Sequence, residues 1–246
     1  MTLAFRILDW SAWAPEPYSE VQSSPDGSGT VGDTDVAPAV APDVKDLPMS
    51  LRRRLSPAGK MALRVAYDVG CGKSDRLVFS SRYGDCNQTV AMLKDLATET
   101  PLSPARFSTS VHNAYAGLLS IASGNRQSHT AIAAGPASFC AGLTEAICLA
   151  LDDPGLPVVL VQYDVPVAAF YEVGDDLSPV PVALALRLVA TGTEGQAVSF
   201  SCRPSEDDNQ SSGDPTTAFV EFLAQEQAAW KWTDGTTEWT CEKHAA

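Results

Sequence analysis

The stretch from residue 129 to residue 151 constrains the fold most, because a short apolar strand pattern runs directly into a long helix pattern. His129 to Ala134 has the composition of a buried strand, and Ala137 to Leu151 that of a helix rich in Ala and Gly. Small residues allow such a helix to pack closely against a sheet, and strands that alternate with helices are typical of layered α/β folds. We therefore expect an α/β fold with a mixed sheet packed with helices.

Further strand and helix patterns continue this alternation. The first predicted helix restarts near Pro57 and ends at Gly70, and the segment between Pro101 and Pro104 is predicted to be a loop. Gly192 to Gly195 is predicted to be a hairpin turn, so that the strands on its two sides form a hairpin or an adjacent edge pair. Besides 129–134, the predicted strands are residues 2–13, 76–81, 157–165, 180–190 and 197–202. Besides 137–151, the predicted helices are residues 48–69, 87–98, 111–123 and 216–231.

Two polar regions interrupt these patterns. Residues 18–47 are rich in Ser, Asp, Gly, Pro and Val and nearly lack large apolar side chains, which predicts a flexible exposed loop. Residues 203–215 predict an acidic loop before the final helix. With 246 residues and 45% hydrophobic content, the chain is long enough for one substantial core. We expect residues 1–246 to form a single domain.

Charge and composition exclude several classes of function. The formal net charge is -13 and no long Lys/Arg run could neutralise a phosphate backbone, so nucleic acid is not an expected partner. The longest apolar region, Leu156 to Phe170, is interrupted by polar residues and is too short to cross a bilayer, so we expect no membrane insertion. The six cysteines form no Cys-x-x-Cys pair, and the N-terminus has no secretory signal pattern. We expect a cytoplasmic protein without a metal or a cofactor.

Several short motifs occur in a fixed order along the chain. They are Ile7-x-x-Trp10-x-Ala12-Trp13-Ala14-Pro15, then Arg52-Arg53-Arg54-Leu55-Ser56-Pro57 with Met61-Ala62-Leu63, then Ser108-Thr109-Ser110-Val111-His112-Asn113-Ala114, Ala116-Gly117, Ser120-Ile121, Gly124-Asn125-Arg126 and the unit from Ala131 to Ala146. Together they resemble the N-terminal half of the beta-ketoacyl synthases of the thiolase superfamily, in particular the short chain-length-factor-like subunits found beside ketosynthases in aryl polyene pigment pathways. The resemblance implies a truncated thiolase-like fold, that is, a single α/β half.

The resemblance also implies a cysteine nucleophile at the turn between strand and helix, where the helix N-terminus lowers the pKa of the thiol. Here the turn carries Gly135 and Pro136, and no nucleophile stands at it. Cys140 lies about one helical turn further on, roughly 5 Å along the axis, and is interpreted as a buried structural cysteine. Ser138 is interpreted as a helix-start residue whose hydroxyl hydrogen-bonds the backbone.

The catalytic histidines that the family carries in its second half have no counterpart in this sequence. The chain contains only His112, His129 and His244, and none has the Gly-Thr surroundings typical of the family's histidines. The chain is also too short for a second α/β half. We therefore predict that no residue is catalytic.

The same resemblance predicts a tunnel or interface region around the strand–turn–helix unit. The strand from His129 to Ala134 is expected to pair across a subunit interface, and Phe139 is expected to limit the acyl tunnel. The tunnel or interface candidates are His112, Asn113, His129, Ile132, Ala134, Gly135, Pro136, Ser138, Phe139 and Cys140.

Some of the polar candidates have a plain structural interpretation as well. His112 and Asn113 are either tunnel or interface residues or a polar helix end that satisfies local backbone groups. Arg52, Arg53 and Arg54 are either contacts for an acidic acyl carrier protein or a solvated helix face.

We therefore expect a non-catalytic, chain-length-factor-like partner of a ketosynthase. It would shape the acyl tunnel and stabilise the heterodimer during polyketide or fatty-acid-like chain elongation on an acyl carrier protein. Two alternatives stay open. One is a small acyltransferase that uses Cys140 or Ser138 with His112 as base, and the other is a free-standing acyl-binding protein.

Overall fold

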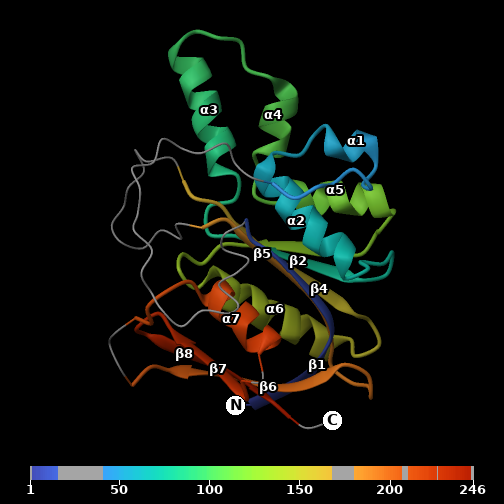
Figure 1. The fold of residues 1–246 in the computed structure, drawn as a ribbon. Helices are drawn as coiled ribbons and strands as arrows, with labels where there is room; N and C mark the ends of the chain where they lie inside the picture. The colour runs from blue at the N-terminus through green and yellow to red at the C-terminus, as the bar shows by residue number, and fades with distance from the viewer. Residues whose placement is uncertain (1, 16–40, 168–179, 207–209, 226, 245–246) are drawn as a thin grey trace.

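An eight-stranded mixed sheet forms the centre of the protein in the computed structural model, which describes residues 2–15, 41–167, 180–206, 210–225 and 227–244 (Figure 1). The strand order is β3-β2-β4-β5-β1-β6-β8-β7. The pairs β3–β2 and β2–β4 are parallel, and all other pairs are antiparallel. The strands are β1 (Thr2–Trp13), β2 (Arg76–Ser80), β3 (His129–Ile132), β4 (Val158–Asp164), β5 (Val182–Val189), β6 (Gln196–Pro204), β7 (Ala229–Thr233) and β8 (Thr237–Lys243).

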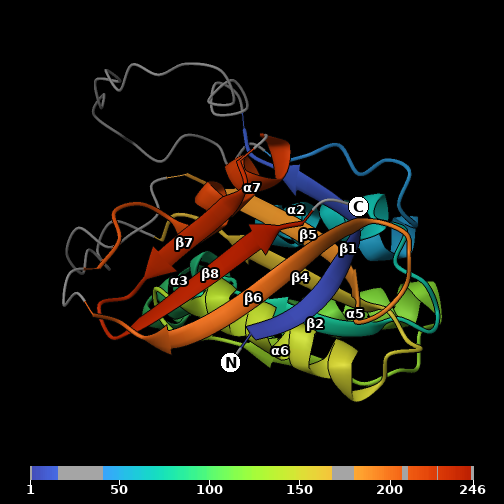
Figure 2. The same ribbon diagram turned by 90° about the horizontal axis from the view of Figure 1, so that it is seen from below.

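Helices cover both faces of this sheet. α2 and α5 lie on one face and α6 and α7 on the other, while α3 and α4 extend away from the sheet on the α2 side (Figure 1). The sheet curves beyond β1, so that β6, β8 and β7 enclose α6 and α7 from the side opposite β4 and β5 (Figures 1 and 2). The helices are α1 (Met49–Arg52), α2 (Pro57–Asp68), α3 (Cys86–Ala97), α4 (Pro104–Thr109), α5 (Ala114–Ser123), α6 (Ser138–Asp152) and α7 (Pro215–Ala224).

α6 packs closely on the sheet because a glycine faces β2. A Cβ atom at Gly142 would lie 2.7 Å from the Cβ of Ser80, closer than two such atoms can approach. On the same helix Phe139 is fully buried and stacks against Phe219 and Trp230, with ring centroids 5.0 and 5.9 Å away. The close packing predicted from the small residues of this helix is therefore confirmed.

β1 is the strand at which the sheet changes direction. Its N-terminal half pairs with β6, its C-terminal half pairs with β5, and the register shifts between Ile7 and Asp9. The segment between β5 and β6 crosses β1 at this point, where a Cβ on Gly195 would lie 2.3 Å from the carbonyl oxygen of Ile7. The Arg6 guanidinium donates hydrogen bonds to the carbonyl oxygens of residues 193–195 at 2.6 to 3.1 Å and holds the crossing in place.

Several predictions about the secondary structure are wrong. β1 lies between β5 and β6, so these two strands form neither a hairpin nor an adjacent pair, and the glycines at 192 and 195 belong to a crossing segment. Pro104 begins the short helix α4 instead of ending a loop, because Ser103 caps it with its side chain. The final helix ends at Ala224, and residues 229–231 belong to β7, which pairs with the unpredicted strand β8.

The two predicted loops lie only partly within the described residues. Residues 18–40 and 207–209 lie outside them. In the described part, Val44 and Leu47 are buried against the α2 side of the sheet, and Asp46 forms an ion pair with Arg64 at 2.7 Å. Arg203 lies in β6 and Asp214 caps α7.

Only glycine fits at position 195, where the segment between β5 and β6 crosses β1. We expect Gly195→Ala to lower the free energy of unfolding by at least about 2 kcal/mol, because φ is +77° and the added Cβ would clash with the Ile7 carbonyl. Urea unfolding followed by circular dichroism would measure this loss.

Gly192→Ala is the matched control for this prediction. Gly192 also has a positive φ of +135°, but its added Cβ would meet no atom within 4 Å. Gly192→Ala should therefore lower the free energy of unfolding by less than Gly195→Ala does, and this smaller loss should reflect backbone conformation alone. Equal losses for the two variants would contradict the crossing as the constraint.

Candidate functional site

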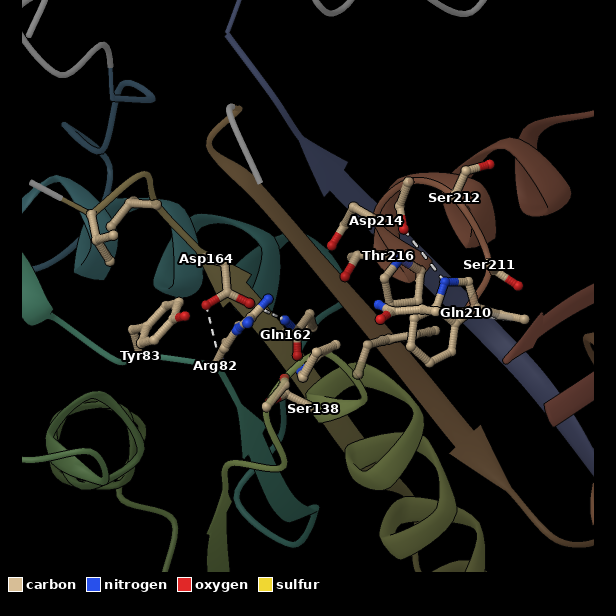
Figure 3. Close-up of a pocket in the computed structure, with 18 residues that line it drawn as sticks. Arg82, Tyr83, Ser138, Gln162, Asp164, Gln210, Ser211, Ser212, Asp214 and Thr216 are labelled. Carbon is tan, nitrogen blue, oxygen red and sulfur yellow. Dashed lines mark hydrogen bonds between the residues drawn. The ribbon is translucent and has the colours of Figure 1, made fainter. Parts of the chain in front are cut away.

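The candidate site is a cavity of about 490 Å³ at the carboxyl ends of β2 and β4 (Figure 3). The N-terminal turn of α6 and the segment that leads into α7 close its other sides. Ligand sites of open α/β sheets lie at the carboxyl ends of parallel strands, where the loops meet helix N-termini. Its walls come from residues 82–83, 135–139, 162–167 and 210–216 and from Trp232.

Asp164 at the end of β4 is the most perturbed acid in the cavity wall. Its Oδ1 accepts hydrogen bonds from the Ser81 hydroxyl and the Arg82 backbone amide, both at 2.9 Å, and its Oδ2 accepts one from Gln162 Nε2 at 2.7 Å. The pKa of Asp164 is raised to about 7, mainly by burial and to a lesser extent by the nearby Asp214, against the hydrogen bonds from Ser81 and Arg82, which lower it. A substantial fraction of Asp164 is therefore protonated near neutral pH.

Asp214 faces Asp164 across the cavity from the start of α7 (Figure 3). Its Oδ2 caps the helix by accepting hydrogen bonds from the backbone amide and the hydroxyl of Thr217, at 2.7 and 3.0 Å. Burial raises the pKa of Asp214, although its contacts with Thr217 and Thr216 lower it. The two carboxyl groups thus destabilise each other's charged form.

Gln162 contributes to the cavity wall a buried oxygen without a hydrogen-bond partner. It uses its Nε2 on Asp164, but its Oε1 accepts nothing from the described residues, and the side chain is only 1% exposed. The Thr216 hydroxyl is fully buried and contacts the Asp214 carboxyl without a hydrogen bond of normal geometry to any described residue. A buried polar group without a partner costs about 1–3 kcal/mol, so a bound group with a donor would stabilise this wall.

The turn before α6 uses its polar groups on itself. Gly135 has a left-handed backbone with φ of +57°. The Ser138 hydroxyl donates to the Gly135 carbonyl at 2.7 Å and accepts from the Ala134 amide at 2.9 Å. The Ser138 carbonyl in turn accepts from the Ser80 hydroxyl at 2.6 Å. The interpretation of Ser138 as a helix-start residue bonded to the backbone is confirmed.

Cys140 and His112 do not form a nucleophile–base pair with each other in this arrangement. Cys140 is fully buried in the core between α6 and the sheet, and burial raises the pKa of its thiol well above the usual range. His112 Nε2 lies 2.9 Å from the Ser81 carbonyl oxygen on the other side of the β2 end. A buried neutral thiol is a poor nucleophile, because the thiolate is the reactive form.

Four of the tunnel or interface candidates line the cavity, namely Gly135, Pro136, Ser138 and Phe139. The remaining six do not line it. His129 and Ala134 are exposed, and Ile132 is half-buried at the β3 edge of the sheet. Asn113 is exposed at the start of α5, where its side chain makes no capping hydrogen bond. Cys140 and His112 lie as described above.

The three candidate arginines lie next to a second, smaller cavity of about 310 Å³. Arg53 and Arg54 line it together with Arg106 and the hydroxyl groups of Ser56 and Thr109. Arg52 is half-buried and does not line it.

Sequence reasoning missed the acidic and amide side of the main cavity. Gln162 and Asp164 lie in the predicted strand 157–165, and a polar pair at the end of an apolar strand was the available signal. Thr216 and Asp214 lie where an acidic loop meets a helix, and the Asp-Pro-Thr-Thr sequence is a helix-start pattern that carries no hint of a cavity.

The described residues meet the requirements of neither a metal site nor a membrane-spanning helix. In the ranges that the structure describes, no group of three or more His, Cys, Asp or Glu side chains could hold a metal ion. Among the described helices, none has the length and apolar character needed to span a bilayer.

Residues 10–242 match the model of the beta-ketoacyl synthase N-terminal domain, and the chain belongs to this family. Its fold is the thiolase-like fold of the ketosynthases, present as a single mixed α/β half. The predicted family and fold class are therefore confirmed.

Two solved structures show the same fold. A chain of the ketosynthase (ApeO) in complex with its chain length factor (ApeC) from Xenorhabdus doucetiae is 24% identical with a TM-score of 0.77, and the match covers 98% of this chain and 99% of that one. A chain of the ishigamide ketosynthase/chain length factor is 17% identical with a TM-score of 0.62, covering 90% and 73%. The curated proteins compared with this chain include no match.

The raised pKa of Asp164 predicts that stability falls as the pH rises. The carboxyl has a pKa of about 7 in the folded protein and about 3.8 when unfolded, so between these values the folded state binds more protons. The unfolding free energy should be higher at pH 5 than at pH 8 by on the order of 2 kcal/mol from this group.

Asp164→Asn should remove this contribution. Urea unfolding of both proteins at pH 5 and pH 8 measures it, and the dependence left in the variant reports Asp214. Identical pH dependence in the two proteins would show that Asp164 ionises normally.

Proposed function

We propose that this chain is a non-catalytic, chain-length-factor-like partner of a ketosynthase. It would stabilise a heterodimer and help to shape the acyl tunnel during chain elongation on an acyl carrier protein, in a polyketide or fatty-acid-like pathway of the aryl polyene pigment type. A cytoplasmic location is part of the proposal.

The observation that carries this proposal is the state of the turn before α6. By the resemblance, the family's nucleophile would lie at this turn, which here carries Gly135 and Pro136. The nearby Ser138 hydroxyl has both its donor and one acceptor site engaged by backbone groups. The Cys140 thiol is buried in the core with a raised pKa. These observations support a non-catalytic role.

The exposed edge of the sheet supports assembly with a second subunit. β3 is the last strand on its side of the described sheet. The Leu77 amide bonds to the Ser128 carbonyl and the Ser81 amide to the Ile132 carbonyl, so the even-numbered residues of β3 face β2. The peptide groups of His129 and Ala131 therefore face outward, where a partner strand can add to them.

Apolar side chains near this region also favour a partner. Phe107 is 62% exposed and Ile121 is 77% exposed, and Leu93, Leu96 and Val111 are exposed as well. They lie on α3, on α4 and around α5, and exposed apolar groups of this size typically mark an interaction surface. The structures similar to this chain include two whose names pair a ketosynthase with a chain length factor.

The carrier-protein contact is proposed at the second cavity. Arg53 and Arg54 are exposed there, and Arg106 lies beside them in an ion pair with Asp95 at 2.8 Å. Exposed arginines of this kind attract acidic partners and speed their association.

The acyltransferase alternative is less well supported by the geometry. It needs Cys140 or Ser138 within hydrogen-bond reach of a base, and His112 instead lies against the Ser81 carbonyl. The free-standing acyl-binding protein remains as the second candidate, and binding of acyl groups without any ketosynthase would favour it.

Substitutions of the two candidate nucleophiles separate these functions. We expect Cys140→Ala and Ser138→Ala to leave the activity of a reconstituted ketosynthase complex within about twofold of wild type, since neither group is placed to react. Each should lower the unfolding free energy by about 1–2 kcal/mol, through a small cavity or lost hydrogen bonds.

Product formation by the co-expressed complex measures the activity, and Cys241→Ala is the control for the loss of a buried thiol. Loss of product with Cys140→Ala or Ser138→Ala in an intact complex would make the chain an enzyme.

A proline at an outward-facing position of β3 tests the proposed interface. Ala131→Pro removes an amide that bonds to no described strand, and proline is tolerated on edge strands. We expect the variant to keep the fold but to reduce co-purification with its ketosynthase at least tenfold.

Thr130→Pro is the comparison for this variant, because the Thr130 amide faces β2 and its loss should damage the sheet itself. Circular dichroism and pull-down of both variants distinguish the two effects. Undiminished co-purification of Ala131→Pro would place the interface elsewhere.

A further inference from the structure

The main cavity contains a buried acceptor without a donor to match it. Gln162 Oε1 belongs to a side chain that is 1% exposed, and it has no hydrogen-bond partner among the described residues. The Asp164 and Asp214 carboxyls and the buried Thr216 hydroxyl line the same space, and Figure 3 shows these four side chains directed toward it from β4 and from the start of α7. A bound group with hydrogen-bond donors would satisfy this side of the cavity.

The described charged side chains that line the cavity leave room for one positive charge. They are the carboxyls of Asp164 and Asp214 and the guanidinium of Arg82, which lies 5.0 Å from the centre of the Tyr83 ring. When both acids are ionised, these three groups sum to a single negative charge. A monovalent cation would balance it and favour the ionised form of both acids.

Apolar and aromatic side chains also line the cavity. Pro136, Phe139, Val165 and Trp232 are among them. A cavity of about 490 Å³ that combines such side chains with a few polar groups has the size and character of a small-molecule site. An inorganic cation would leave these walls uncovered, and the described residues contain no cluster that could hold a metal.

We propose that this cavity is a binding site for a small organic ammonium ion with an apolar body. The ammonium carries three N–H donors and no acceptor, so it can reach Gln162 Oε1, the Thr216 hydroxyl and the Asp214 carboxylate, while its hydrocarbon part contacts Phe139 and Trp232. The site is independent of pairing with a ketosynthase, because every group named belongs to this chain.

Isosteric probes test the proposal on the full chain, free or in its complex. We expect n-butylammonium to bind saturably, with a raised melting temperature and a calorimetric isotherm. The neutral 1-butanol and the anionic butyrate should bind at least tenfold more weakly. Equal binding of 1-butanol would show a merely apolar pocket, and no binding of butylammonium to the folded chain would show that water alone fills it. Either result overturns the proposal.

Two variants link the binding to these atoms. Asp214→Asn should lower the affinity for butylammonium at least tenfold while it keeps α7, because Asn is as good a helix cap as Asp. Thr216→Val should weaken binding severalfold, because it removes an oxygen that is proposed to accept from the ammonium, and circular dichroism would check that the variant keeps its fold. Asp43→Asn makes the same charge change at an exposed residue outside the cavity and should leave the affinity unchanged. An unchanged affinity in Asp214→Asn would contradict the site.

Discussion

The rest of the structure depends on the crossing at which the chain passes over β1. By pairing with β6 through one half and with β5 through the other, β1 joins two parts of one sheet that face each other across α6 and α7. The crossing is possible only because Gly195 has no side chain against the Ile7 carbonyl and because Arg6 binds three carbonyl oxygens. Without it, α6 would be covered on one side only, and its buried aromatic residue Phe139 would lose its contacts with α7 and β7.

This enclosure also produces the cavity. In an open sheet the carboxyl ends of β2 and β4 would face solvent, but here the curved edge brings the start of α7 against them, so that Asp214 and Thr216 face Asp164 and Gln162. Carboxyl groups withdrawn from water in this way have raised pKa values, and amide and hydroxyl groups lose their water partners. These buried polar groups are therefore a direct consequence of the fold, and a bound group that hydrogen-bonds to them would lower their cost.

The sequence predicted the parts of the fold in which local pattern and tertiary contacts agree. β1, β2, β4 and α6 were predicted within one or two residues, because they are apolar over their whole length or carry a continuous apolar face. β7 and β8 were missed because Trp230, Trp232 and Trp239 alternate with polar residues in short strands that were absorbed into a helix pattern or left unassigned. The neighbour relation of β5 and β6 was also missed, since a short Gly-containing link usually marks a hairpin and only the insertion of β1 overrides it. The acidic half of the cavity comes from segments far apart in sequence, which no local pattern connects.

The turn before α6 is held rigidly by its own hydrogen bonds. A reactive cysteine at a helix N-terminus needs an exposed sulfur near the helix amides, whereas Cys140 points into the core and Ser138 bonds back onto the turn. The turn is therefore fixed by hydrogen bonds to its own backbone and to Ser80, and it can serve as a rigid wall. A rigid wall beside an unsatisfied polar cavity is the arrangement expected of a binding surface, because preorganised groups lose little entropy when a ligand or a partner arrives. In this chain the family fold thus holds the turn before α6 in a fixed conformation, with Gly135 and Pro136 at its tip and the Ser138 hydroxyl engaged by backbone groups.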